Sequence, residues 1–227
     1  RETIKMAVTL ANNKLEEYKC DGNLALHIKL VKNETDVFDK DKSFHPDMSH
    51  QVFGDSEMIF GYKNLEVQLY YHAGSLLTYL GVKYDEMVDK SSGEGIEADD
   101  AVSKVAEFLA PGYCSNLDQF ISKLPEEDKF VPMGEMIHSF TDTEKTYQVY
   151  KAGVTTPNFI KYHKKLQTFL FWYIDGSSLI DVDDDKWDFF LIFEKCSEAG
   201  TTTYRIVGYA TVYEYYAYPD MKRPRIR

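Results

Sequence analysis

The stretch that decides the fold lies at the end of the chain, where residues 204–227 read YRIVGYATVYEYYAYPDMKRPRIR. This composition predicts an aromatic β-strand, then a turn and the first residues of another strand. Apolar side chains fill both alternating sets of positions, which are Tyr204, Ile206, Gly208, Ala210 and Val212 on one face and Val207, Tyr209, Tyr213 and Tyr215 on the other. Such a strand belongs inside a sheet that is covered on both sides. Because the chain stops where a new strand opens, we expect a fragment of a longer protein.

Length and composition describe an ordered globular chain. With 227 residues it can bury a sizeable core and hold one or two domains. Its 17 tyrosines and 14 phenylalanines argue against disorder. The formal net charge of −11 disfavours direct nucleic-acid binding, because phosphate binding needs a basic face. The same charge suits a basic partner, and it equally suits a surface whose acidity only keeps the protein soluble.

The cysteines and the hydropathy pattern point to the cell interior. Cys20, Cys114 and Cys196 are widely spaced and form no C-x-x-C pair, which fits a reducing compartment better than a disulfide framework or a zinc site. No apolar run is long enough to cross a membrane, and the N-terminus lacks a signal-peptide core. We therefore expect a soluble intracellular protein with no membrane contact. The first residue is Arg1, so the N-terminus is also expected to be incomplete.

The front of the chain is predicted to be mainly β-structure. Leucine and isoleucine alternate with polar residues over residues 24–30, which predicts a strand. A polar loop is expected from there to about His50, and residues 58–88 are predicted to form several strands. The Ser- and Gly-rich segment 91–95 is expected to be a flexible break.

Two helices are predicted next. Asp99 or Asp100 can cap the first, which should stop at Pro111-Gly112, and Asn116 can cap a second, short one.

The charged run at residues 125–129 opens on a proline and separates helical from β-rich sequence. We interpret it as a domain boundary, with residues 1–128 as the first domain and 129–227 as the second. A hairpin over residues 134–152 is expected to open the second domain.

A long helix is predicted to start at Thr156-Pro157, with a cap followed by proline at the first helical position. It should place His163 on its apolar face, as a core or interface histidine, and hold Asp175 in its last turn. A strand and a turn at residues 197–200 then lead to the aromatic strand. This α+β order is compatible with the front half of an acetyl-CoA-dependent N-acetyltransferase sheet, truncated before the cofactor loop.

Two motif matches are rejected on chemical grounds. Residues 205–210 fit the R-x-x-G-x-A pattern of acetyl-CoA pyrophosphate loops, but they should lie in mid-strand, where sheet pairing takes the N–H groups. The aspartates of residues 181–185 resemble a calcium loop, yet Lys186 and Ile192 stand where glycine and a glutamate ligand are needed. The acidic loop is then either simply solvated or the rim of a site for a basic peptide.

No pattern of side chains by itself indicates a reaction. The six histidines have no metal-ligand spacing, so no metal is expected, and neither G-x-S-x-G nor a cysteine-nucleophile signature is present.

Several segments taken together resemble the catalytic subunit of type B histone acetyltransferases. They are HQVFGD at 50–55, FGYK at 60–63, LYYHAGSL at 69–76, EADD at 97–100, LQTFL at 166–170, IDVDD at 180–184, GYATVYEYY at 208–216, YPD at 218–220 and RPR at 223–225. The resemblance covers nearly the whole chain from about Leu15. It rests on the order and density of the segments, because none of them is a chemical motif alone.

This resemblance implies an enzyme that transfers acetyl from acetyl-CoA to lysines in the N-terminal tail of newly made histone four. It implies a WD-repeat histone-chaperone subunit as partner and a nuclear and cytoplasmic location. The implied architecture is an N-terminal mixed α/β domain that holds the histone tail, followed by the acetyltransferase domain. The family's main catalytic glutamate and its Q-x-x-G-x-G acetyl-CoA loop come after Arg227. No cofactor-binding residue is therefore expected in this chain, and the chain alone is expected to be inactive.

The resemblance also assigns site residues. Positions that match the family's tail-binding elements are Asp55, Ser56, Glu57, Trp187, Tyr213, Glu214 and Tyr215. Carboxylates suit a basic tail, and flat aromatic walls can seat a lysine stem or its cationic head. Ser56 stands where the family would have an acidic residue. By strand alternation alone, the aromatic residues would simply be packed in a sheet.

Asp175 matches a position that is usually glutamate in the family, and it is a candidate auxiliary base. A lysine amine must be neutral to attack, and its ordinary pKa is about 10.4, so a base or a desolvating pocket is required. Aspartate is one methylene shorter than glutamate, and the alternative is a charged residue at a helix end in water. For the chain as a whole, the alternatives are a non-catalytic module that binds a histone tail or the chaperone, and a protein whose acidic surface only serves solubility.

Overall fold

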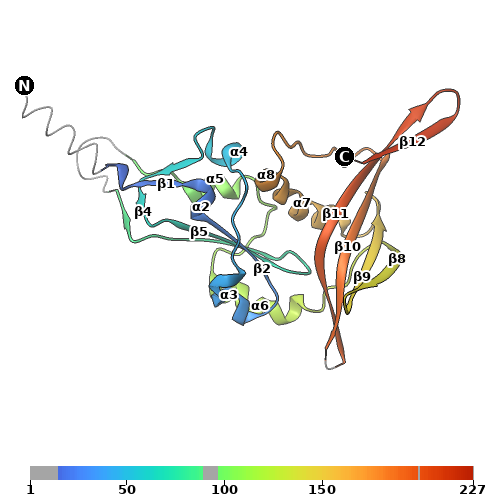
Figure 1. Cartoon of the computed structure of the whole chain (residues 1–227), viewed down its shortest axis with the longest axis horizontal. Coiled ribbons are helices and arrows are strands. Elements are labelled where there is room, and N and C mark those ends of the chain that lie inside the picture. Colours follow the sequence, from blue (N-terminus) through green and yellow to red (C-terminus); the bar gives the residue numbers. More distant parts are fainter. Residues whose placement is uncertain (1–14, 89–96, 199, 227) are drawn as a thin grey trace, which may run out of the picture.

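The structure is a computed structural model that describes residues 15–88, 97–198 and 200–226. Figure 1 shows two β-rich regions with a set of helices between them, and a hairpin that projects from the second region. The chain is therefore α+β, as predicted. Segment 91–95, the expected flexible break, lies outside the described residues.

The first region is built on a small mixed sheet with the strand order β2-β5-β6. Strand β2 (Leu26–Val31) runs parallel to β5 (Glu66–His72), which runs antiparallel to β6 (Thr78–Lys83). Every residue of β5 after Glu66 is buried, as expected of a central strand that is covered on both faces. Two short pairs complete the region, β1 (Lys19–Asp21) with β3 (Met58–Phe60) and β4 (Tyr62–Lys63) with β7 (Glu86–Met87).

Short helices stand where the sequence predicted a strand start and a loop. They are α2 (Gly22–Ala25), α3 (Glu34–Phe38), the 3₁₀ turn η1 (Lys40–Lys42) and α4 (His50–Phe53). The Asp21 side chain accepts hydrogen bonds from Asn23 N and Leu24 N, and Asn33 likewise caps α3. Local caps therefore determine these helices, which are too short to show a 3.6-residue period.

The two helices predicted in the middle of the chain are present. Asp100 caps α5 (Ala101–Ala106), which ends before the expected Pro111-Gly112 stop. Asn116 caps α6 (Leu117–Glu127), which continues through Pro125. The first residues of the expected boundary run are thus helical, and the division into residues 1–128 and 129–227 stays a prediction.

The second region is an antiparallel sheet of five strands in the order β12-β11-β10-β9-β8. The predicted hairpin is confirmed as β8 (Glu135–Asp142) and β9 (Lys145–Ala152). Strands β10 (Trp187–Glu198) and β11 (Thr201–Ala217) form a long pair, and β12 (Met221–Ile226) is the next strand that the last residues predicted. Strand β11 is therefore an inner strand of the sheet.

A β-bulge in β11 changes which of its side chains share a face. Ile192 pairs with Gly208 and Phe193 with Ile206, so Val207 is the extra residue. The prediction that Ile206 and Tyr209 lie on opposite faces is wrong, because the bulge places both on the face that packs against the helices. Coverage on both sides is also incomplete, since Val207 is 51% exposed.

The long helix predicted after Thr156-Pro157 is divided into α7 (Phe159–Leu166), the 3₁₀ turn η3 (Gln167–Phe169) and α8 (Leu170–Tyr173). Its cap is Asn158 with φ 63°, while the Thr156 hydroxyl accepts a hydrogen bond from Gly153 N. The expectation that Asp175 lies in the last turn is wrong, because α8 ends two residues earlier.

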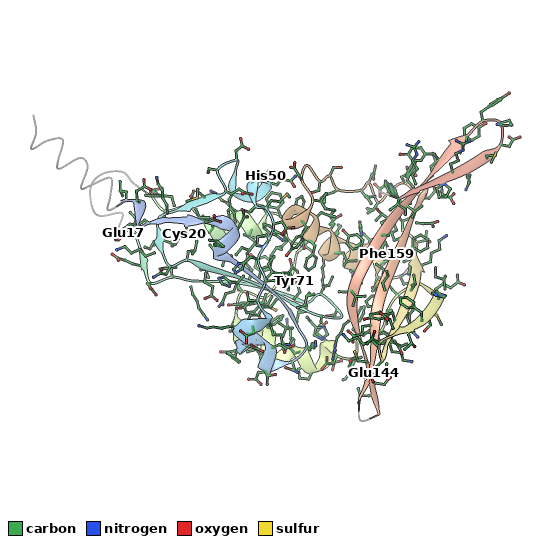
Figure 2. All side chains as sticks on the ribbon, in the orientation of Figure 1. Glu17, Cys20, His50, Tyr71, Glu144 and Phe159 are labelled. Carbon is green, nitrogen blue, oxygen red and sulfur yellow. The ribbon has the colours of Figure 1, made fainter. Side chains whose placement is uncertain are left out.

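The helices α7 and α8 pack between the two sheets and share one core with both. Trp172, Tyr71, Phe159, Phe189 and Phe193 are fully buried in it. Figure 2 labels Tyr71 in the first region and Phe159 beside the second sheet. Each buried side chain of this size stabilises the fold by about 1.5–3 kcal/mol relative to exposure. Among the described residues, no helix has the length and apolar character needed to span a bilayer. The same residues contain no group of three or more side chains suited to hold a metal ion.

Candidate functional site

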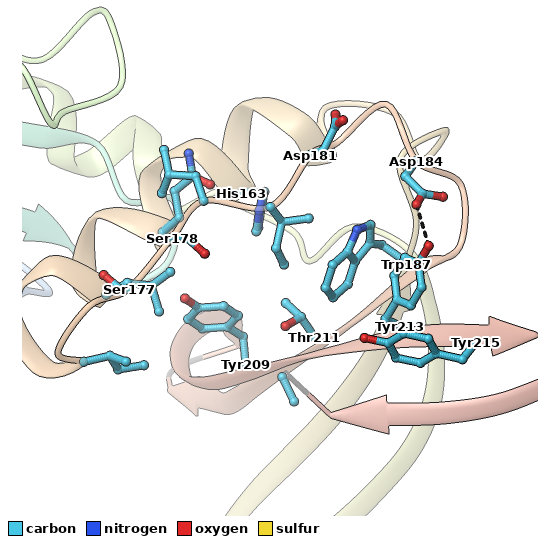
Figure 3. A pocket seen from close by; sticks show the side chains of 16 residues that line it. His163, Ser177, Ser178, Asp181, Asp184, Trp187, Tyr209, Thr211, Tyr213 and Tyr215 are labelled. Atoms are coloured by element: carbon cyan, nitrogen blue, oxygen red, sulfur yellow. Dashed lines mark hydrogen bonds between the residues drawn. The ribbon is translucent and has the colours of Figure 1, made fainter.

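A pocket of about 740 Å³ opens between the β10–β11 pair and the helices (Figure 3). One wall consists of Trp187 on β10 and the alternate β11 residues Tyr209, Thr211, Tyr213 and Tyr215, and the register that follows the bulge places Trp187 opposite Tyr213. The opposite wall comes from α7, η3 and α8, and the rim is the loop of residues 174–184. The sequence predicted three of these residues, Trp187, Tyr213 and Tyr215, and the structure brings them together.

These three residues form an aromatic corner at the outer part of the pocket. The ring centroids of Trp187 and Tyr213 lie 4.8 Å apart, and those of Tyr213 and Tyr215 lie 4.7 Å apart. Arg225 Cζ lies 5.2 Å from the centroid of the Tyr215 ring, so a cationic side chain already lies against this ring. The corner is thus a flat apolar surface with electron-rich ring faces.

A carboxylate stands beside this aromatic corner. The Tyr213 hydroxyl donates a 2.9 Å hydrogen bond to Asp184 Oδ2, and Lys186 N donates to Asp184 Oδ1 at 3.0 Å. The backbone N–H of Lys186, with help from the Tyr213 hydroxyl, lowers the pKa of Asp184. The bond to Asp184 in turn raises the pKa of Tyr213. Asp184 is therefore an anion at neutral pH, and with Asp181 it makes the rim negative.

The inner part of the pocket is polar but uncharged. His163 is only 2% exposed and lies between the rings of Phe159 and Phe189. Burial lowers its pKa to about 4, so the imidazole is neutral at pH 7. Within the described part of the chain, neither ring nitrogen of His163 nor the buried Tyr209 hydroxyl has a hydrogen-bond partner.

The acidic segment assigned to tail binding lies at the turn after α4, outside the pocket lining. Asp55 and Ser56 are exposed there. The Glu57 carboxylate accepts hydrogen bonds from Ser49 N at 2.6 Å, from His50 N at 3.0 Å and from Asn23 Nδ2. These donors, Ser49 N first, lower the pKa of Glu57. Its charge therefore already stabilises the N-terminus of α4.

Asp175 is exposed next to the pocket rim. Its Oδ1 atom lies 3.1 Å from His50 Nε2, and His50 Nδ1 lies 3.7 Å from Glu57 Oε1. The neighbouring residues Gln51 and Ser177 exchange two hydrogen bonds, and Ser177 lines the pocket. Helix α4 thus connects the acidic turn to the rim, although Asp175 itself does not line the cavity.

Glu214 is the one assigned strand residue that does not face the pocket. It lies between Tyr213 and Tyr215 on the strand and therefore points to the opposite face. Its Oε2 atom lies 2.7 Å from Lys222 Nζ on β12, which lowers the pKa of Glu214. The carboxylate is thus engaged within the sheet.

Sequence reasoning did not assign three polar residues of the pocket, His163, Tyr209 and Asp184. His163 was expected in a core, and it is buried as expected, yet it also lines the cavity. Tyr209 shares the odd-numbered positions of Tyr213 and Tyr215, so strand alternation was a usable signal. Nothing in the local sequence indicates that Asp184 would meet Tyr213, because the contact joins a loop to a strand.

The pyrophosphate-loop match at residues 205–210 does lie in mid-strand. Arg205 and Ala210 are both in register with β10, and Ile206 N donates to Ala73 O at 2.9 Å. These backbone groups do not form a phosphate cradle.

Comparison with known proteins supplies the family. The model described as "Histone acetyl transferase HAT1 N-terminus" matches residues 18–175. The chain belongs to this family.

Similar proteins from mammals and from a fungus share the same name. The chain is 45% identical over 219 residues to the "Histone acetyltransferase type B catalytic subunit" of Mus musculus, and equally to that of Homo sapiens. In both cases the match covers 94% of this chain and 52% of the relative. The protein of the same description from Cryptococcus neoformans is 31% identical over 247 residues, covering 93% of this chain and 59% of the relative. The chain thus spans about half the length of the curated relatives it matches.

Proposed function

We propose that this chain is the histone-binding part of a type B histone acetyltransferase catalytic subunit, and that its pocket receives a lysine side chain of the histone-four tail. In the intact enzyme, acetyl passes from the thioester of acetyl-CoA to the lysine amine. Family membership and the match to half of each relative support this division of roles.

The observation that carries the proposal is the aromatic corner of Trp187, Tyr213 and Tyr215 beside the Asp184 anion. A lysine has a four-carbon apolar stem and a cationic end. Aromatic faces bury the stem and attract the cation, and a nearby carboxylate adds charge attraction. The net charge of −11 favours approach of a basic tail over the rest of the surface.

The acidic turn after α4 is proposed to hold the tail outside the pocket. Asp55 is exposed and suited to pair with a basic residue of the tail, and Ser56 can donate or accept a hydrogen bond. Glu57 acts by fixing α4, since its carboxylate already accepts three hydrogen bonds. Glu214, which is paired with Lys222, would act by orienting β12.

Asp175 is proposed as an auxiliary group that helps a lysine lose its proton. It lies at the rim, which the lysine amine would pass as it moves from the carboxylates at the mouth into the pocket. His50 lies within 3.1 Å and can orient the Asp175 carboxylate toward the cavity. The principal base is expected in the part of the enzyme that follows this chain.

For the whole protein we propose the architecture that the family implies. Residues 1–128 hold the tail, and residues 129–227 supply the front of an acetyltransferase sheet, here the five antiparallel strands β8–β12. The acetyl-CoA loop would lie beyond this chain. A WD-repeat histone-chaperone subunit and a nuclear and cytoplasmic location complete the proposal. Its alternative is a module that binds the tail or the chaperone without catalysis.

The test is calorimetric titration of the purified chain with a histone-four tail peptide. Binding should be weakened at least about tenfold by Trp187→Ala and by Tyr215→Ala, because each removes a wall of the corner. Tyr216→Ala is the matched control, since Tyr216 is on the same strand, 71% exposed and outside the pocket. Equal affinity in all four proteins would overturn the proposal. Acetyl transfer to the peptide by the isolated chain would show instead that its acetyl-CoA site is complete.

A further inference from the structure

Two buried polar groups in the pocket have no partner among the described residues. Tyr209 on β11 and His163 on α7 lie on opposite walls, and Figure 3 shows both side chains at the cavity. The Tyr209 hydroxyl and both His163 ring nitrogens are buried without a hydrogen bond. Native proteins rarely leave such groups unpaired, so a site for a hydrogen-bonding ligand group is indicated here.

The charges of the pocket are confined to its rim. Asp181 and Asp184 belong to the loop, whereas the inner walls carry His163, Tyr209 and other uncharged residues. Burial raises the pKa of Tyr209 to about 12 and keeps His163 neutral, so neither group is charged at pH 7. A cation that moved inward would lose both water and the carboxylates and would gain no new ion pair.

We infer that the inner end of the pocket binds the nitrogen of the ligand side chain as an uncharged group, through His163 and Tyr209. This inference rests on the proposed function. The ligand class is a lysine in its neutral amine form and, equally, an acetyl-lysine.

The hydrogen-bonding capacities of the two residues match both forms. A neutral amine can donate one N–H to the imidazole and one to the Tyr209 oxygen, which leaves its lone pair free to attack. An acetamide can donate its N–H to His163, while its carbonyl accepts from the Tyr209 hydroxyl. The pocket would therefore hold the acceptor before acetyl transfer and the product afterwards.

The number of protons released on binding distinguishes this arrangement from one in which the lysine stays an ammonium ion at the mouth of the pocket. A free lysine is an ammonium ion at pH 7, so binding as an amine releases one proton to solvent. The groups that face the ligand are Asp181, Asp184, Tyr213 and Tyr215 around the mouth, with His163 and Tyr209 inside. If the carboxylates hold the ammonium at the mouth instead, no proton is released.

The experiment uses three histone-four tail peptides that carry lysine, acetyl-lysine or norleucine at one position, tested one position at a time. Norleucine has a similar apolar stem but lacks the nitrogen. The acetyl-lysine peptide should bind the wild-type chain at least as tightly as the lysine peptide. Calorimetry in buffers of different ionisation enthalpy should show proton release with the lysine peptide only.

Tyr209→Phe removes one oxygen. It should lower the affinity for the acetyl-lysine peptide about fivefold and leave the affinity for the norleucine peptide unchanged. Tyr204→Phe, on the same strand but outside this pocket, is the control. His163→Phe is a second variant, and its fold is first checked by circular dichroism. Its affinity for the acetyl-lysine peptide is then compared with its affinity for the norleucine peptide, as for Tyr209→Phe.

The inference is overturned if acetyl-lysine binds more weakly than lysine, or if Tyr209→Phe affects the three peptides equally. It is also overturned if lysine binds without proton release. Failure of the proposed function looks different, because then none of the three peptides binds the wild-type chain.

Discussion

Trp187 lies directly opposite Tyr213 in the β10–β11 pair because one extra residue, Val207, shifts the register between them. Without the bulge Trp187 would face Val212, and Tyr213 would point to the other side of the sheet, since a one-residue slip exchanges the two faces. The bulge therefore creates the aromatic corner.

Insertion of one alanine after Ala210 should abolish binding of the histone-four tail peptide, because it moves Tyr213 and Tyr215 by one position along β11 and so to the other face of the sheet. Val207→Thr keeps the residue count and the β-branched shape, and it should bind like wild type. Both proteins are compared by calorimetry, with circular dichroism as a check of folding. Undiminished binding by the insertion variant would show that the corner is not the binding surface.

The rim carboxylate Asp184 should give the peptide affinity its salt dependence. Added salt screens the attraction between the rim and a basic tail, because the screening length is about 10 Å near 0.1 M and shortens as salt is added. The affinity of the wild-type chain should therefore fall as salt is raised from 50 to 300 mM. Asp184→Asn should bind more weakly at low salt and respond less to salt. Asp183→Asn, in the same loop but outside the pocket lining, is the control. Identical salt slopes for all three proteins would contradict a role for Asp184.

The buried imidazole of His163 should make the fold sensitive to mild acid. The folded state keeps its pKa at about 4, against an ordinary value of 6.5, so only the unfolded chain takes up the proton as pH falls below 6.5. The stability contribution of this group is thus complete above pH 6.5 and lost as pH falls toward 4. Between pH 7 and 5 the loss is about 2 kcal/mol.

Urea unfolding of wild type and His163→Phe at both pH values checks this prediction. Burial also lowers the pKa values of His27 and His72, and both proteins share that part of the pH response. The variant should therefore lose less stability than wild type on acidification. An equal loss in the two proteins would contradict it.

Phe193 should be a major contributor to the packing of the five-stranded sheet. It is fully buried, and its ring meets those of Phe130, Tyr162 and Tyr204. Phe193→Ala should lower the free energy of unfolding by about 3–5 kcal/mol. Phe140→Ala, on the edge strand β8 and 42% exposed, should cost less than about 1 kcal/mol. Chemical denaturation of both variants measures the difference, and equal costs would contradict the assigned core.

The sequence allowed prediction of those elements whose signal is local. Two strand-like segments within residues 134–152 predicted the β8–β9 hairpin. Candidate capping residues, Asp99 or Asp100 and then Asn116, predicted the starts of two helices. The helix after Pro157 was placed two residues early, because Asn158 adopts a left-handed conformation that sequence preferences do not reveal. Its interruption at residues 167–169 depends on packing between two sheets.

The candidate site was predictable only in part, for a related reason. The resemblance to the family pointed to Trp187, Tyr213 and Tyr215, whereas strand alternation alone favoured plain sheet packing. The bulge at Val207 arises where Ile206 N bonds to Ala73 O, more than a hundred residues away in the chain, so its position is a tertiary effect. The placement of His163 and Tyr209 on opposite walls of one pocket depends on the same packing of helix against sheet.

The most direct test of the account is to locate the bound lysine. A histone-four tail peptide with a diazirine-bearing lysine analogue is photo-crosslinked to the purified chain, and the modified residues are identified by mass spectrometry. The account predicts crosslinks to Trp187, Tyr209 and Tyr213, which unlabelled peptide suppresses. Crosslinks confined to the exposed edge strands β8 or β12, with none in the pocket, would contradict it.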